Sequence, residues 1–345
     1  MTTSSQGPGL SPISGSYAGS FGVVALAAYR PDADLFERQL KSIQAQSHTN
    51  FECLISVDGD AATVREMVAR ICGDDDRFRV LGFDERLGFH LNFERILKAV
   101  PDRARWIALS DQDDHWYPDK IAALLPLLTE AALVTGQARV VTTQFGDEID
   151  PESTRTNRRN VPATDLIATN QATGSMCVFR TELLALALPF PQLGTPSQYH
   201  DHWLGLCALA AGGVLIKDSV LQDYIQHEGN VVGESSQAFL RSVRNTLKIV
   251  RRFEPDAGVA SISRLIYKTG LGWRTLMAST LLSRLRTSGR TAPADVVTAL
   301  EIYASPRSIQ VVSSLAKGVA RRNVSPVRFL EITLGVLVRP WQSQG

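Results

Sequence analysis

The sequence predicts an α/β protein with a mostly parallel central sheet, followed by a helical region at the C-terminus. The first observation is a rhythm: between residues 21 and 128, short apolar runs alternate with segments whose apolar residues recur at helical spacing. Such a β-α-β-α order is typical of a parallel sheet covered on both faces by helices. The second observation is a division of charge. Residues 236–345 hold 17 of the 36 basic residues and 5 of the 35 acidic ones, so they carry +12 and residues 1–235 carry −11. This split indicates two regions with different partners.

Four apolar runs are predicted as strands, and the periodic segments after them as helices. The strands are expected at residues 21–29, 51–57, 77–83 and 106–109. The helical stripes are expected at residues 36–43, 64–71, 89–97 and 121–128, the first behind Asp34 as a candidate N-cap. Ligands of open α/β sheets bind outside the carboxyl ends of the strands, which is where Tyr29, Asp58 and residues 111–114 fall.

Composition bounds the organisation of the chain. Because 345 residues exceed what one core usually organises, we expect a large domain with a smaller appendage. We place a disordered tail rich in Ser, Gly and Pro at residues 1–20, the main domain at 21–235 and a basic helical region at 236–345. The tail lacks the features of a signal peptide, and no stretch reaches the roughly 18 apolar residues of a membrane span, so a cytoplasmic protein is expected. The four cysteines have no metal-ligand spacing and are expected to be buried.

The run Asp111-Gln112-Asp113-Asp114 places three carboxylates directly after a predicted buried strand. Carboxylates packed this closely repel one another unless a cation or several donors neutralise them. A hard divalent cation such as Mg²⁺ commonly bridges carboxylates to substrate phosphates. The alternative is a helix cap ahead of Pro118, but one carboxylate is enough for a cap. The run therefore predicts a metal–diphosphate site.

A set of ordered motifs carries a family resemblance. The motifs are Ala27–Tyr29, Gln39–Ser47, Ser56–Gly59, Arg86–Phe89 with Asn92–Phe93, Ala108–Asp114 with Trp116, Thr173–Met176, His200–Trp203 and Tyr224–Gly233. With them, residues 21–235 resemble the family 2 glycosyltransferases of the GT-A fold, a nucleotide-sugar-binding fold. The last two motifs and the Asp-Gln-Asp-Asp run are most similar to the bacterial rhamnosyltransferase-like branch.

The resemblance implies a donor site for a dTDP- or UDP-sugar. In it Asp58 hydrogen-bonds the pyrimidine base, Tyr29 stacks on that base, and Gly88 and Asn92 belong to the same site. The residues alone leave two alternatives open, a turn at Asp58-Gly59 and a core position for Tyr29.

The resemblance also gives roles to the acidic run. Asp111 and Asp113 would contact the donor, while Asp113 and Asp114 would bind a divalent cation, Mg²⁺ or Mn²⁺. His227 is a candidate further ligand, because imidazole suits Mn²⁺; the alternative is a hydrogen-bonded structural histidine. Such a cation would stabilise the diphosphate as a leaving group.

Asp201 is the candidate catalytic base. It stands at the start of a predicted helix, where the alternative is a helix cap. By the resemblance, Asp201 takes the proton from the acceptor hydroxyl as that oxygen attacks the sugar. Near the acceptor, His200 and His202 would orient the base, and Gly174 would let the backbone approach the donor or acceptor closely. Trp203 would offer a flat platform to a sugar ring, or it would be a packing residue.

The basic C-terminal region is expected to be helical. Basic amphipathic helices favour a membrane surface with anionic lipids, and residues 329–341 are the candidate dipping segment. The alternative is a solvated face packed on the main domain. No pattern for nucleic-acid binding is present, so no nucleic-acid partner is expected.

Together these features predict an inverting, metal-dependent glycosyltransferase of cell-surface polysaccharide synthesis, peripheral at the inner face of the membrane. It would move a sugar, with rhamnose as a candidate, from a nucleoside diphosphate to a glycan or lipid-linked acceptor. A sugar nucleotidyltransferase is the first alternative, but it would need a Gly- and Lys-rich loop that residues 27–31 do not resemble. The second is an inactive nucleotide-sugar-binding or scaffold protein, against which the intact Asp113, Asp114 and Asp201 argue.

Overall fold

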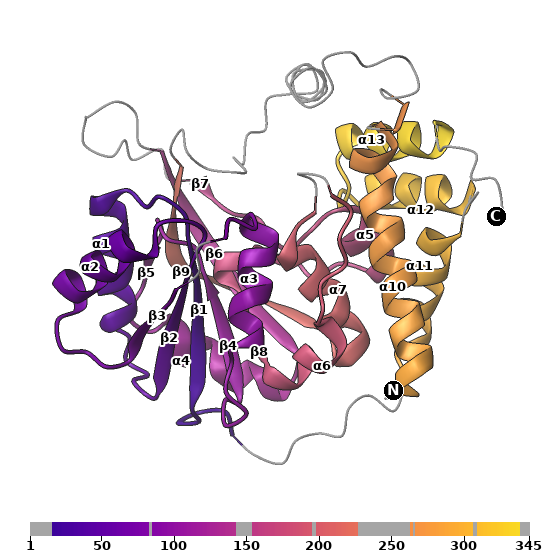
Figure 1. Cartoon of the computed structure of the whole chain (residues 1–345). Coiled ribbons are helices and arrows are strands. Elements are labelled where there is room, and N and C mark those ends of the chain that lie inside the picture. The colour runs from indigo at the N-terminus through magenta and orange to yellow at the C-terminus, as the bar shows by residue number, and fades with distance from the viewer. Residues whose placement is uncertain are drawn as a thin grey trace.

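The computed structural model of the chain describes residues 16–82, 85–142, 154–194, 198–226, 263–264, 266–305 and 309–338. Figure 1 shows a twisted sheet on the left, a group of C-terminal helices on the right, and helices α5 to α7 between them. The predicted α/β fold with a helical C-terminal region is confirmed.

The first half of the sheet is parallel, as predicted. Its strands are β1 (Gly22–Ala28), β2 (Phe51–Val57), β3 (Phe78–Leu81) and β4 (Trp106–Ser110), in the spatial order β3-β2-β1-β4. The helices between them are α1 (Ala33–Gln44), α2 (Ala61–Cys72) and α3 (Phe89–Lys98). The strands β2 and β4 are buried along their whole length, which explains their continuous apolar runs.

Local signals start the helices of this half. The Asp32 carboxylate, rather than that of Asp34, caps α1 by accepting the backbone N–H groups of Asp34 and Leu35. The Asp60 carboxylate caps α2 in the same way. Both caps satisfy N–H groups that have no partner within the helix. The chain therefore turns into each helix just beyond a strand end, which keeps the carboxyl edge of the sheet close to the loops.

The second half of the sheet is mixed, which the sequence did not indicate. Its strands are β5 (His115–Trp116), β6 (Leu133–Thr142), β7 (Thr154–Arg155), β8 (Val178–Arg180) and β9 (Val214–Gln226). The order continues β4-β8-β6-β9-β5, with β8 antiparallel to both β4 and β6, and β6 parallel to β9. The short helices here are α4 (Lys120–Leu124), η1 (Leu125–Thr129), α5 (Ala163–Ala168), η2 (Gly174–Met176), η3 (Thr181–Leu183) and α6 (Leu184–Ala187), followed by the longer α7 (His200–Ala211).

The C-terminal helices share a core with the main domain. They are η4 (Lys268–Gly272), α10 (Trp273–Ser288), α11 (Ala294–Ala304), α12 (Ile309–Ala320) and α13 (Pro326–Leu337). One apolar cluster runs from Phe93 on α3 through Trp203 on α7 to Trp273 and Tyr303. These helices therefore pack on the main domain through this cluster, while the boundary predicted at residue 235 lies outside the described residues.

The predicted N-terminal tail reaches too far. Residues 1–15 lie outside the described part, but Tyr17 is only 1% exposed and belongs to the core. The Trp106 indole N–H donates to the Ser20 carbonyl, which ties this segment to the sheet. The folded domain thus begins before residue 20.

Two further expectations concern the surface and the cysteines. None of the helices in the described ranges is long and apolar enough to cross a membrane. All four cysteines are buried with free thiols, as predicted.

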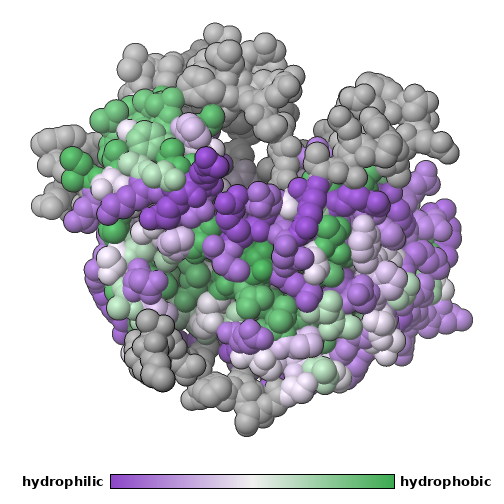
Figure 2. All heavy atoms as spheres, turned by 180° about the vertical axis from the view of Figure 1, so that it is seen from behind, coloured by the Kyte–Doolittle hydropathy of each residue, from purple (hydrophilic) through white to green (hydrophobic). Residues whose placement is uncertain are grey.

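Apolar side chains gather at the end of the molecule that carries α13 (Figure 2). On α13 itself, Leu334 and Leu337 are exposed.

A polar clip joins the C-terminal region to the main domain. Asp165 on α5 is 1% exposed, and its two carboxylate oxygens accept hydrogen bonds from the Arg321 guanidinium at 2.7 and 3.1 Å. The Asn323 amide donates to the same carboxylate at 2.8 Å. A buried carboxylate needs such donors, so the clip fixes the turn after α12 on α5.

We expect Arg321→Met to lower the free energy of unfolding by about 1 to 2 kcal/mol, because Asp165 loses two charge-assisted donors while solvent already screens the outer side of Arg321. Chemical or thermal unfolding measures the change. The matched control is Arg322→Met, the same substitution at the neighbouring exposed arginine, for which a change within about 0.5 kcal/mol is expected. Equal losses in both variants would contradict the clip.

Candidate active site

The predicted site residues of the first half meet at one edge of the sheet. Strands β1, β2 and β4 are parallel neighbours, so Tyr29, Asp58 and the acidic run all follow carboxyl ends at the same edge. The Gln112 side chain links two of these ends, because its oxygen accepts the Tyr29 N–H at 2.7 Å and its amide donates to the Tyr29 carbonyl at 3.1 Å. The sequence analysis gave Gln112 no role.

The three carboxylates of the acidic run differ in environment. Asp111 and Asp113 are partly exposed, whereas Asp114 is fully buried and accepts a hydrogen bond from the Gln222 amide at 3.0 Å. The other oxygen of Asp114 is buried without a hydrogen-bond partner among the described residues. Burial, with a smaller contribution from Asp113, raises the pKa of Asp114 to about 7. The cation contact expected of Asp114 stays a prediction, since one of its oxygens has no partner among the described residues, and Asp111 and Asp113 are the more exposed members of the run.

Asp201 is connected to this run through η2, although 87 residues separate it from Asp114: the Gly174 N–H donates to Asp201, and the Gln222 amide donates to both the Ser175 hydroxyl and Asp114. Burial raises the pKa of Asp111 well above its ordinary value, and the charges of Asp114, Asp113 and Asp201 raise it further. The sheet therefore brings the predicted base and the predicted diphosphate site into one electrostatic environment.

Asp201 is held at the N-terminus of α7 by backbone donors. Its two oxygens accept the Gly174 N–H at 2.9 Å and the His202 N–H at 2.7 Å. Burial raises the pKa of Asp201 to about 6, and these hydrogen bonds oppose the rise. A carboxylate with a pKa near neutrality can both accept and release a proton under ordinary conditions.

The neighbours of Asp201 on α7 serve packing, which corrects the sequence analysis. Trp203 is fully buried and its indole N–H donates to the Ala187 carbonyl at 2.8 Å, so it offers no platform to an acceptor. The His202 ring bonds the Leu166 carbonyl at 2.8 Å, and burial lowers its pKa to about 3. Both side chains anchor the helix rather than contact the base or the acceptor.

His200 and Gly174 pack against each other below the base. The His200 ring stacks on Phe93 with 3.8 Å between ring centroids, and burial lowers its pKa well below the ordinary value. A Cβ atom on Gly174 would lie 2.8 Å from His200 Nε2. The close approach predicted for Gly174 is therefore an approach to His200.

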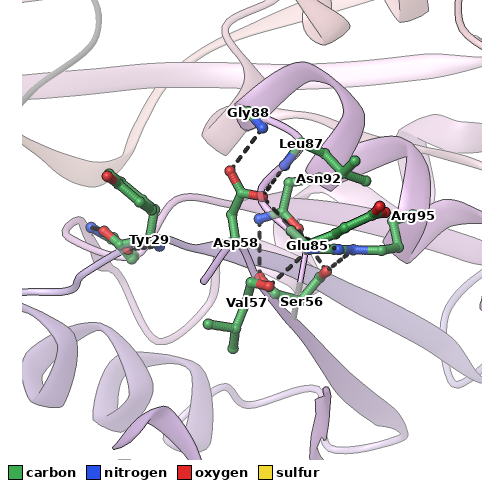
Figure 3. Close-up of polar contacts among 10 residues, drawn as sticks. Tyr29, Ser56, Val57, Asp58, Glu85, Leu87, Gly88, Asn92 and Arg95 are labelled. Carbon is green, nitrogen blue, oxygen red and sulfur yellow. Dashed lines mark hydrogen bonds and ion pairs between the residues drawn. The ribbon is translucent and has the colours of Figure 1, made fainter. Parts of the chain in front are cut away.

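Asp58 holds a loop of the protein (Figure 3). It is 3% exposed, and its two oxygens accept the Leu87 N–H at 2.5 Å and the Gly88 N–H at 2.8 Å. Arg95 lies 3.9 Å away as an ion-pair partner. A base that hydrogen-bonds Asp58 would have to share an oxygen with these donors, so the base contact stays a prediction.

The other donor-site candidates divide in the same view. Asn92 is 2% exposed and is used up by Ser56 and Arg95, whose hydroxyl and guanidinium donate to its oxygen at 2.6 and 2.7 Å. The Asn92 side chain therefore joins α3 to β2 and does not point toward a sugar-nucleotide site, which corrects its assignment to the donor site. Tyr29 is partly exposed, and the Arg86 guanidinium lies 4.4 Å from its ring centroid. Arg86 was noted only as part of a motif, and its position over a candidate base platform needed the structure.

The acidic run offers carboxylate oxygens to a divalent cation, but it does not form a complete set of protein ligands within the described ranges. No group of three or more His, Cys, Asp or Glu side chains in the described ranges is arranged to hold a metal, and His227 lies outside these ranges. Asp111 and Asp113 nevertheless offer oxygen donors in a crowded acidic setting. Mg²⁺ is commonly bound by one or two carboxylates together with substrate phosphates, which this donor set allows.

Comparison with known proteins gives one family. Residues 24–186 match the model of the family described as glycosyl transferase family 2. None of the curated proteins compared with the chain matches it.

Solved structures of similar shape are distant in sequence. TarS of S. aureus, residues 1–349 in complex with UDP-GlcNAc, is 14% identical, with 91% of this chain and 90% of that chain covered and a TM-score of 0.49. The mannosyltransferase PcManGT from Pyrobaculum calidifontis, in complex with GDP-Man and Mn²⁺, is 15% identical, with 93% and 87% covered and a TM-score of 0.46. Likenesses this distant say nothing about the site of this chain.

We expect Gly174→Ala to lower both stability and activity, because the new Cβ must displace either the stacked His200 or the backbone N–H that holds Asp201. Overpacking of this kind costs about 1 to 3 kcal/mol. Thermal unfolding and a transfer assay measure the two effects. The control is Gly205→Ala on α7, the helix that carries His200 and Asp201, where the new Cβ would lie 3.2 Å from the Ala172 Cβ, a contact that a small shift relieves. A fully active Gly174→Ala variant would argue against this packing.

Proposed function

From the membership of residues 24–186 in glycosyl transferase family 2, we propose that the protein transfers one sugar from a nucleoside diphosphate to an acceptor hydroxyl, with inversion at the anomeric carbon. The observation that carries the proposal is the hydrogen-bonded link between Asp201 and the acidic run: the Gly174 N–H donates to Asp201, and the Gln222 amide donates both to the neighbouring Ser175 hydroxyl and to Asp114. Transfer needs a base beside the diphosphate.

Asp201 is proposed as the general base. As the acceptor oxygen forms its bond to the sugar C1, the bond from C1 to the diphosphate oxygen breaks and the nucleoside diphosphate leaves. The proton of the acceptor hydroxyl passes to the Asp201 carboxylate. Attack opposite the leaving group inverts the anomeric configuration. The pKa of about 6 supports this role, since the carboxylate is ionised near neutral pH and is more basic than an exposed aspartate.

The acidic run is proposed to hold the diphosphate through a divalent cation, Mg²⁺ or Mn²⁺. Asp113 and Asp114 would supply the oxygen ligands with the diphosphate itself, Asp111 would support them, and His227 remains a candidate further ligand. Such a cation would neutralise the charge of the leaving group. The Asp114 oxygen that has no hydrogen-bond partner among the described residues supports this assignment.

The finer substrate assignments rest on the motifs. The Asp58 and Tyr29 edge suits a pyrimidine donor, dTDP- or UDP-linked, with rhamnose as the candidate sugar. The acceptor is proposed to be a glycan or a lipid-linked glycan of the cell surface. A sugar nucleotidyltransferase would instead release inorganic diphosphate from a nucleoside triphosphate, so product analysis separates the two reactions.

We expect Asp201→Asn to lower the transfer rate by about 10²- to 10⁴-fold with little change in donor affinity, because the amide cannot take the proton. Transfer is measured with a panel of nucleotide sugars in the presence of Mn²⁺ or Mg²⁺. The matched control is Asp295→Asn in the first turn of α11, an exposed acidic residue at an equivalent helix position.

The pH profile of the wild-type enzyme gives the second half of this test. Only ionised Asp201 can act as a base, so kcat/KM should rise with pH through about 6 and then level off. The residual rate of Asp201→Asn should lack this rise. Unchanged transfer in Asp201→Asn, or a profile that is the same in both proteins, would reject Asp201 as the base.

The end of the molecule that carries α12 and α13 is proposed to dock on an anionic lipid surface. Ile309, Leu334 and Leu337 are 81%, 40% and 74% exposed there, which is unusual for large apolar side chains. Arg322 and Lys317, both exposed, lie on or beside α12. Exposed apolar residues bordered by basic ones suit a membrane of negative charge. This surface would bring the site near a lipid-linked acceptor.

We expect the double substitution Leu334→Ser with Leu337→Ser to reduce co-sedimentation with vesicles that contain anionic lipid, because both apolar contacts are lost. Leu87→Ser is the matched control. Leu87 is the other exposed leucine of the described residues, but it lies in the main domain beside Asp58 and outside the proposed docking surface. Binding should also weaken with added salt and vanish with neutral vesicles. Equal pelleting of all three proteins would reject the docking surface.

A further inference from the structure

Lys120 is a buried lysine to which the proposed reaction has assigned no role. It is 1% exposed, and its ammonium donates to the Ser175 carbonyl at 2.6 Å and to the Gln222 side-chain oxygen at 2.5 Å. The ammonium also lies 3.6 Å from the ring centroid of Trp116. Burial lowers its pKa, while the charges of Asp114 and Asp111 oppose this shift. An amine buried at such a cost is expected to hold specific partners in place.

The first partner that Lys120 orients is the Gln222 amide. Because the amide oxygen accepts from Lys120, the amide nitrogen faces the other way and donates to the Asp114 carboxylate and the Ser175 hydroxyl, each at 3.0 Å. Both donor hydrogens of the amide are thus used. Rotation of the amide would turn its oxygen toward a carboxylate, so Lys120 fixes the orientation in which Gln222 supports Asp114.

The second partner connects Lys120 to the base. Ser175, whose carbonyl accepts from Lys120, follows Gly174 in η2, and the Gly174 N–H donates to Asp201. A continuous set of hydrogen bonds and one peptide unit therefore runs from Asp114 through Gln222, Lys120 and η2 to Asp201. It joins three segments that are distant in the sequence, α4, β9 and η2.

We propose that Lys120 is a positioning residue of the transfer reaction, which sets the acidic run and the Asp201 carboxylate at a fixed separation through Gln222 and Ser175. This inference rests on the proposed function. Lys120 does not contact the substrate: it holds the two carboxylate groups between which the sugar is transferred. A misplacement of either group lowers the rate steeply, because the reacting atoms must be aligned.

The test compares Lys120→Met, which keeps the length of the side chain and removes the ammonium, with the wild-type enzyme. We expect kcat/KM for transfer to fall by about ten- to a hundredfold, since the buried Ser175 and Gln222 oxygens lose their donor. The gain in affinity for UDP, dTDP or GDP on adding Mn²⁺ over EDTA should also shrink, because Asp114 no longer supports the acidic run. A role in stability alone would leave that gain unchanged. Lys41→Met, the same substitution at an exposed lysine of α1, is the control and should match wild type in both measurements.

Gln222→Met provides the second variant, because it cuts the same link while Lys120 stays in place. If Lys120→Met fails to fold, the same losses are expected in Gln222→Met. Wild-type kcat/KM and a wild-type Mn²⁺ effect in either folded variant would overturn the proposal. A wild-type enzyme that transfers no sugar would instead refute the proposed function, and the role of Lys120 would then be decided by nucleotide affinity alone.

Discussion

The repulsion among four carboxylates at one edge of the sheet is the constraint on which the site depends. Burial raises the pKa of Asp111 and Asp114, and nearby carboxylates raise it further: Asp114, Asp113 and Asp201 act on Asp111, and Asp113 acts on Asp114. In a medium of low polarity such charges are costly unless donors or cations lie beside them. The chain supplies partial compensation: the Gln222 amide at Asp114, backbone N–H groups and the N-terminus of α7 at Asp201, and the Lys120 ammonium between them. The negative charge that these groups leave uncompensated would be neutralised by the proposed cation, which would in turn attract the donor diphosphate.

This compensation explains why the sheet is divided into two halves. The parallel half delivers the acidic run at the end of β4, as strands with buried apolar runs do. The mixed half supplies the groups that are connected to this run by hydrogen bonds: Gln222 from β9, Ser175 from η2 next to β8, and Asp201 from α7. Neither half contains a complete site. The antiparallel strand β8 lies directly beside β4, and this pairing brings η2 under the acidic run.

The difference between the halves also decides what could be predicted. Short apolar runs identified β1 to β4, helical periodicity identified α1 to α3, and their order identified the edge at which Asp58 and the acidic run meet. The motifs identified the family, which is confirmed. Strands of two or three residues, such as β5 and β8, are too short for a period to appear. For Trp203 the packing alternative holds, whereas the side chains of His202 and Asn92 bind groups of the protein itself, which the sequence could not indicate because the direction of a side chain depends on tertiary packing. Lys120 and Gln222 carry no motif that sequence reasoning could weigh, since their partners are 47 to 108 residues away.

The C-terminal region also supports the position of Asp201, although its positive charge suggested a separate appendage. Trp273, Met277 and Tyr303 share one apolar cluster with Trp203 and Leu204 on α7, the helix whose first turn carries Asp201. Arg274 on α10, itself 5% exposed, donates to the Ala168 carbonyl at the end of α5. Removal of the helices would expose this cluster at a cost of roughly 1.5–3 kcal/mol for each large side chain, and it would free the helix that positions the base. The proposed membrane docking of this region and its support of the helix that carries Asp201 therefore have to be separated by substitutions on its outer face, because a truncation changes both at once.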